Sequence, residues 1–102
     1  MKSAYYTELG GSEVLKLGEM ERLEPGDMDV RVKIAVSGVN PSDWKARERG
    51  RAGVLEFPKI IPQSDGAGIV DSIGGGVSHV SEGDRVWVLN GQWQRPYGTA
   101  AE

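Results

Sequence analysis

The 102-residue sequence contains no cysteine and only one histidine. The lack of cysteine excludes a disulfide framework, a thiolate nucleophile and any metal site built on thiolates. The single histidine, His79, stands in the polar stretch 78–81 without the serine and aspartate pattern of a catalytic triad. We therefore interpret His79 as an exposed surface residue, and the absence of cysteine fits a reducing compartment.

The sequence also lacks a long apolar run and an excess of positive charge. Its first eight residues, MKSAYYTE, contain no apolar core of a signal peptide, and no segment is long enough to span a membrane. The net charge is −3, which gives no reason to expect nucleic acid or an acidic membrane as a partner. The expectation is a cytoplasmic, globular protein of one domain.

Glycine, by contrast, is abundant, with 15 residues, and five prolines accompany it. This composition, without a repeat, predicts many short strands joined by turns. The predicted strands span 3–7, 14–17, 30–37, 66–73 and 85–89, and a last strand begins at Thr99.

The clearest predicted strand is the segment 30–37, where aliphatic residues occupy every second position. This alternation predicts a strand with one buried face. Trp87 alternates with aliphatic residues in the same way within 85–89, so we expect it to pack in the core. The segment 51–64 contains two prolines and is predicted to be a loop that Ile60 and Ile61 anchor to the core.

One short helix is predicted over 42–49. Asn40 suits the N-cap, Pro41 the first helical position and Gly50 the position after the helix. Asn40 has a second interpretation, because it lies between a buried strand and a helix, where a side chain can point into a cleft. Residue chemistry alone leaves the two roles of Asn40 open.

The glycines of the segment 66–71 resemble the start of a dinucleotide-binding motif. The sixth position of that motif is Asp71, however, and the β-branched Ile69 and Val70 predict a strand where the motif needs a helix. We therefore interpret these glycines as strand bends and expect the phosphates of any cofactor to bind elsewhere.

Several other polar and aromatic residues allow two interpretations each. Ser64 and Asp65 either face a cleft or make turn hydrogen bonds, and the turn is the simpler interpretation. Trp44 and Trp93 either line a pocket or cover one end of the domain. The basic residues of 45–51 are typical of a solvated helix face, although they could also meet an anionic ligand.

Four segments taken together resemble one enzyme family, the medium-chain dehydrogenase/reductase superfamily in its zinc-free quinone oxidoreductase (zeta-crystallin-like) branch. The resemblance covers essentially the whole chain. These segments are VSGVNPSDWK at 36–45, IPQSDGAGIV at 61–70, GDRV at 83–86 and GTAAE at 98–102.

The resemblance implies a mainly β fold, a GroES-like, partly open β-barrel with one short helix. Residues 1–102 would be the N-terminal part of the catalytic domain, truncated before the Rossmann domain that binds NADPH in such enzymes. The active site would lie in the cleft between the two domains, so the isolated chain is expected to be inactive.

The resemblance also assigns roles to individual residues. Zinc-dependent members have a Cys-His pair where this chain has Asn40 and Pro41, and a His-Glu pair at Ser64 and Asp65, so no zinc is expected. Asn40 would be the catalytic residue, contacting the nicotinamide or the substrate carbonyl, and Asp43 would steady the turn. The candidate cleft residues are Asn40, Pro41, Asp43, Lys45, Ser64, Asp65 and Trp93.

Two of these positions depart from the family pattern. Lys45 occupies a place where quinone reductases often have a tyrosine, and Gln63 replaces the glycine that usually precedes the Ser-Asp pair. The substitution at Gln63 is expected to change the loop or to narrow the cleft.

The implied reaction is hydride transfer from NADPH to a quinone or an activated carbonyl or alkene. One alternative is an enoyl or alkenal reductase of the same superfamily, and another is a non-catalytic β-barrel interaction module. The expected partners are a nicotinamide cofactor and a small quinone or enone, with no nucleic acid and no membrane. Unpaired strand edges suggest a homodimer.

Overall fold

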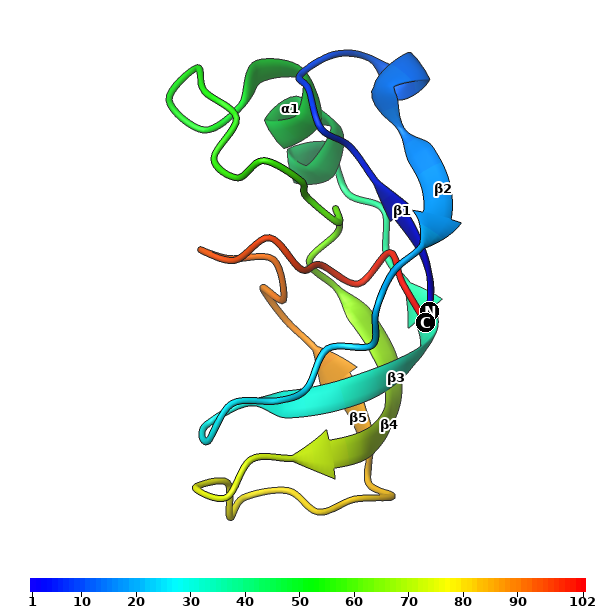
Figure 1. Cartoon of the computed structure of the whole chain (residues 1–102), viewed down its shortest axis with the longest axis vertical. Helices are drawn as coiled ribbons and strands as arrows, with labels where there is room; N and C mark the ends of the chain where they lie inside the picture. Colours follow the sequence, from blue (N-terminus) through cyan, green and yellow to red (C-terminus); the bar gives the residue numbers. More distant parts are fainter.

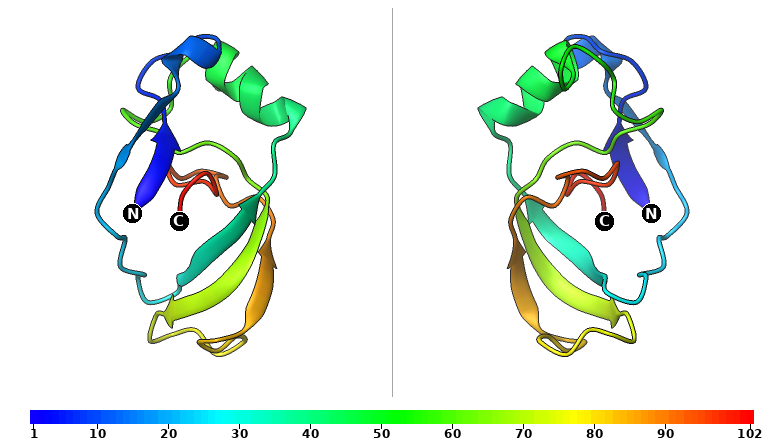
Figure 2. Two further views of the ribbon diagram at one scale, coloured as in Figure 1. Left: turned by 90° about the vertical axis from the view of Figure 1, so that its right-hand side faces the viewer. Right: turned by 90° about the vertical axis from the view of Figure 1, so that its left-hand side faces the viewer.

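A computed structural model describes residues 1–102. Figure 1 shows the molecule as two parts along its long axis, with β1, β2 and α1 in the upper half and a twisted three-stranded sheet in the lower half. The C-terminal segment crosses between them and ends beside the N-terminus, where the amide of Glu102 donates to the carbonyl of Lys2 at 3.1 Å. The two sheets do not close into a barrel (Figure 2), which confirms the predicted mainly β, partly open fold.

The upper half begins with β1 (Lys2–Tyr5), which pairs in antiparallel fashion with β2 (Lys16–Glu19). Between them lies a short 3-10 helix, η1 (Ser12–Val14). The strand predicted over 14–17 is therefore wrong at its start and begins two residues later. The 3-10 turn directs Val14 inward, where it is buried with Tyr6 and Ile60 in the main apolar cluster.

The lower sheet has the strand order β3 (Val30–Ser37), β4 (Gly66–Ile73) and β5 (Arg85–Val88), all antiparallel. These three strands confirm the predictions from periodicity. The β3–β4 register shifts twice, at Asp71 of β4 between Arg31 and Val32, and at Ala35 of β3 between Ile34 and Val36, and such bulges bend the strands. Because of these bends and an uncovered outer surface, β3 does not bury one complete face as predicted, and Val36 is 63% exposed.

The outer surface of this sheet is apolar and open. Val36 and Trp87 both pair with Ala67, and residues directly opposite in a sheet project from the same face. The prediction that Trp87 packs in the core is wrong, because its side chain is 90% exposed. Alternation identifies the residues that share a face, but it does not say whether another layer covers that face.

The helix α1 (Pro41–Arg49) confirms the predicted helix and begins with Pro41 in its first turn. Gly50 ends it with a φ of +69°, the left-handed conformation that favours glycine. The segment after the helix is a loop whose end, Ile60 and Ile61, is buried as predicted. The predicted last strand is reduced to a single bridge between Ala101 and Ser3.

Close packing between β3 and β4 requires glycine at position 68. A Cβ atom added to Gly68 would overlap the backbone of Lys33, whereas one added to Gly75 meets no atom within 4 Å. We expect Gly68→Ala to lower the free energy of unfolding by about 1–3 kcal/mol through overpacking.

Gly75→Ala is the matched control and is expected to change the stability by less than about 1 kcal/mol. Urea unfolding followed by tryptophan fluorescence measures both values. Equal stability of the two variants would contradict the close contact between these strands.

Candidate functional site

Asp65 joins three parts of the chain at the point where β3 ends and β4 begins. Its carboxylate accepts a hydrogen bond from the side-chain amide of Asn40 at 2.7 Å. Its carbonyl oxygen accepts bonds from the amide of Gly38 at 2.8 Å and from the hydroxyl of Thr99 at 2.7 Å. The structure therefore fixes Asp65 against the β3–α1 connection and the C-terminal segment together.

Asn40 lies at the N-cap position of α1 with an extended backbone. Its backbone N–H donates to the carboxylate of Asp43 at 2.7 Å, which is the return bond of a capping box. Its side-chain amide is directed to Asp65 rather than to solvent. Asn40 thus belongs both to the helix start and to a polar cluster with Asp65.

The carboxylate of Asp43 is partly buried beside this cluster. Burial raises its pKa, and the negative charge of Asp65 raises it further, while the hydrogen bond from the Asn40 backbone opposes the rise. The predicted role of Asp43, steadying the turn, agrees with its bond to the N-cap amide.

Gln63 takes a backbone conformation that explains why glycine is usual in this loop. Its φ is +74°, in the left-handed region that costs an ordinary residue about 1–2 kcal/mol. Its side chain accepts a hydrogen bond from the hydroxyl of Ser37, and its carbonyl accepts one from the amide of Thr99 at 2.9 Å. The Ser37 and Thr99 hydroxyls lie 2.7 Å apart, so Gln63 is tied to the same network as Asp65.

A small polar cleft lies between the first turn of α1 and the loop before β4. Its space is about 30 Å³, which accommodates about one water molecule. The polar residues that line it include Tyr6, Asp43, Arg51, Gln63, Ser64 and Gln92. The cleft therefore contains two of the predicted cleft residues, Asp43 and Ser64.

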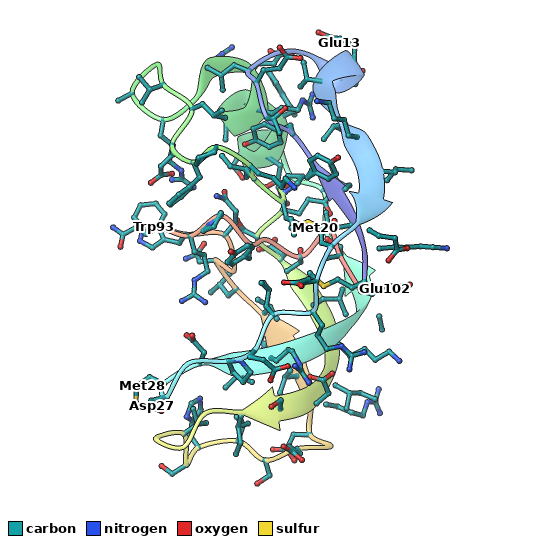
Figure 3. The ribbon with its side chains drawn as sticks, viewed as in Figure 1. Glu13, Met20, Asp27, Met28, Trp93 and Glu102 are labelled. Atoms are coloured by element: carbon teal, nitrogen blue, oxygen red, sulfur yellow. The ribbon has the colours of Figure 1, made fainter.

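Three other predicted cleft residues lie outside this cluster of contacts. Pro41 is exposed at the start of α1. Lys45 is exposed, with its ammonium group 5.7 Å from the centre of the Trp44 ring. Trp93 is 57% exposed on the loop after β5 (Figure 3). The guanidinium of Arg51 lies 5.1 Å from the centre of the Trp93 ring. Both cations thus contact an aromatic ring at the surface.

The structure adds residues that sequence reasoning did not select. Ser37 and Thr99 support Asp65 and Gln63, and Tyr6, Arg51 and Gln92 line the cleft. Thr99 lies within one of the segments that carry the family resemblance, so the resemblance could have identified it as a candidate site residue. No local pattern singles out Tyr6, because its partners are distant in sequence.

The structure also locates His79 and the glycine-rich segment of the sequence. His79 is exposed, as predicted. Gly66–Gly68 lie within β4, so no helix begins there to receive a phosphate. The structure contains no group of three acidic or histidine side chains placed to hold a metal ion. None of its helices is long and apolar enough to cross a membrane.

Comparison with protein families gives one match across most of the chain. Residues 24–100 match the alcohol dehydrogenase GroES-like domain. This match confirms the resemblance inferred from the four sequence segments.

Individual relatives are oxidoreductases. The chain is 41% identical over 88 residues to an alcohol dehydrogenase of Moraxella sp. (strain TAE123), covering 86% of this chain and 25% of the relative. It is 38% identical over 91 residues to the quinone oxidoreductase of Rattus norvegicus, covering 88% and 27%. It is 34% identical over 89 residues to an NADPH-dependent alkenal/one oxidoreductase of Arabidopsis thaliana chloroplasts, covering 85% and 23%.

Solved structures give the same result. The quinone oxidoreductase of Escherichia coli complexed with NADPH superimposes with a TM-score of 0.78 at 28% identity, covering 88% of this chain and 27% of that chain. The chain thus spans about a quarter of the length of the relatives that it matches.

The left-handed backbone at Gln63 leads to a test by substitution. We expect Gln63→Val to be less stable than Gln63→Gly by about 1–2 kcal/mol, because a β-branched residue is strained at positive φ. Thermal or urea unfolding measures the difference.

Glu21 provides the control, since it is exposed and its φ is not positive. There the valine variant should be at least as stable as the glycine variant. The same order at both positions would contradict the left-handed conformation of Gln63.

Proposed function

The chain belongs to the alcohol dehydrogenase GroES-like domain family, and from this premise we propose that it forms the N-terminal part of the catalytic domain of an NADPH-dependent reductase of quinones. The observation that carries the proposal is the Asn40–Asp65 hydrogen bond of 2.7 Å beside Asp43. This bond leaves one N–H of the Asn40 amide to donate to a ligand.

The residues present fit one end of a nicotinamide cofactor and not the other. Asn40 would contact the nicotinamide or the substrate carbonyl, with Asp65 orienting its amide. No described element receives the pyrophosphate, because the glycine-rich segments form β4 and a turn. The cofactor phosphates would bind to a Rossmann domain that follows this domain, and residues 1–102 alone would be inactive.

When bound, the nicotinamide supplies the hydride. The role of this domain is to hold the acceptor and to stabilise the negative charge that develops on its carbonyl oxygen. An amide N–H that is already oriented by a carboxylate needs no rearrangement to do this, which makes it effective in a partly buried site. Asn40 is therefore expected to contribute directly to the rate.

The reaction uses no zinc. In zinc-dependent members of the superfamily, the metal takes the place of the charge stabilisation that Asn40 provides here. Asn40 and Ser64 offer an amide and a hydroxyl, which are weak ligands for zinc compared with thiolate and imidazole.

The proposal also includes the cellular location and the oligomeric state of the enzyme. The enzyme acts in the cytoplasm on a small, diffusible acceptor. The exposed apolar residues of the β5 edge, Trp87 at 90% and Leu89 at 80% exposure, favour a covered position in a larger domain or a homodimer.

A reductase of alkenals or enones is the second candidate. The likeness to the alkenal/one oxidoreductase supports it, and the same cluster would bind the carbonyl of either acceptor. Purified protein from the complete reading frame, assayed for NADPH oxidation with duroquinone and with 2-hexenal, separates the two candidates. Oxidation of NADPH with neither acceptor would contradict both and favour a binding module.

The role of Asn40 is tested in the same assay. Asn40→Ala is expected to lower kcat by about 10²-fold, since it removes a hydrogen-bond donor to a developing oxyanion. His79→Ala is the control, because His79 is exposed in the turn between β4 and β5. The kcat of this variant should equal that of the wild type. Unchanged turnover of Asn40→Ala would remove Asn40 from the mechanism.

A further inference from the structure

Tyr6 is among the most deeply buried residues of the protein, with 2% of its surface exposed. Its backbone N–H and C=O both bond to Ile60 at 3.0 Å. Its ring packs in the apolar cluster with Val14 and Ile60. The position of the phenol is therefore fixed by the surrounding structure.

The hydroxyl of Tyr6 is not engaged in that packing. Ser3 Oγ is the only fully enclosed side-chain polar atom without a partner, and no protein group hydrogen-bonds the Tyr6 hydroxyl. Tyr6 lines the polar cleft together with Asp43, Ser64 and Arg51. A buried phenol beside a polar cleft, with no hydrogen bond to the protein, is a donor that the fold itself leaves unused.

The size of the cleft limits what it can receive. Its space of about 30 Å³ is that of a single water molecule. The carbonyl oxygen of a quinone or enone is of similar size, whereas the ring or alkyl chain would remain outside. Such an oxygen could replace the water and accept the Tyr6 proton as a hydrogen bond.

Burial, rather than the surrounding charge, favours the protonated form of this phenol. Burial raises the pKa of Tyr6 and outweighs the positive charges of Arg51 and Arg47, while Asp43 and Glu56 raise it slightly further. Arg51 is held in place by Glu56 at 3.0 Å and by Gln92 at 3.4 Å. The raised pKa favours the neutral phenol, which is the form that can donate a hydrogen bond to an acceptor oxygen.

We propose that the Tyr6 hydroxyl binds the acceptor's carbonyl oxygen and protonates it during reduction. The proposal rests on the proposed function. As a hydride adds to the acceptor, an electron pair of its conjugated system moves onto the carbonyl oxygen. The O–H bond of Tyr6 then breaks, its proton forms a new O–H bond on the acceptor, and the phenolate regains a proton from solvent through the cleft.

Turnover of a matched pair of variants of the complete enzyme tests the proton transfer. Tyr6→Phe keeps the ring and removes the hydroxyl, and kcat should fall by about 10²-fold, the usual contribution of a general acid. Tyr5→Phe is the control, because Tyr5 lies next to Lys59 rather than in the cleft, and its kcat should be unchanged. Equal thermal stability of both variants excludes a folding defect.

A second measurement, by NMR, detects binding in the cleft without requiring turnover. In protein carrying ¹³C at the tyrosine Cζ atoms, with oxidised NADP present, duroquinone should move the Tyr6 resonance and leave that of Tyr5 in place. An unmoved Tyr6 resonance, or an unchanged kcat of Tyr6→Phe, would overturn the proposal. If the wild-type enzyme reduces no acceptor, the proposed function fails, and the resonance still decides whether the cleft takes the carbonyl oxygen.

Discussion

The site depends on the hydrogen bonds made by Asp65. Its carbonyl oxygen joins the end of β3 to the C-terminal segment through Gly38 and Thr99, and its carboxylate orients the Asn40 amide. Two segments that are distant in sequence, the β3–α1 connection and the C-terminal segment, are thereby fixed against one residue. The Asp65 carboxylate is partly buried, and the Asn40 amide offsets part of its desolvation.

The sequence was sufficient to predict the elements whose signals are local. The alternation in β3, the β-branched residues between the glycines of β4 and the cap residues around α1 predicted elements that the structure contains. The prediction was wrong where packing decides the outcome. Val14 turns inward from a 3-10 helix instead of beginning a strand, and Trp87 lies on an uncovered face. Periodicity predicts which side chains share one face of a sheet, but whether another part of the protein packs on that face depends on the tertiary structure.

The candidate site was predicted in part. Asn40, Asp43, Ser64 and Asp65 were selected through the resemblance to a family, and the structure places them at the start of α1 and the loop before β4. Tyr6 could not be selected from the sequence, because it lies beside the cleft only after the segment following β1 has paired with Ile60. Lys45 and Trp93 instead lie at the surface beside aromatic or cationic partners.

These contacts form one arrangement for reduction, in which Asp65 orients an amide donor and the adjacent cleft supplies a second polar group. In this arrangement Asn40 meets the nicotinamide or the acceptor carbonyl. The most direct measurement is a crystal structure of the complete protein with oxidised NADP and duroquinone. The account predicts the Asn40 amide within hydrogen-bond distance of the nicotinamide or of a quinone oxygen. Both ligands bound away from Asn40 would contradict it.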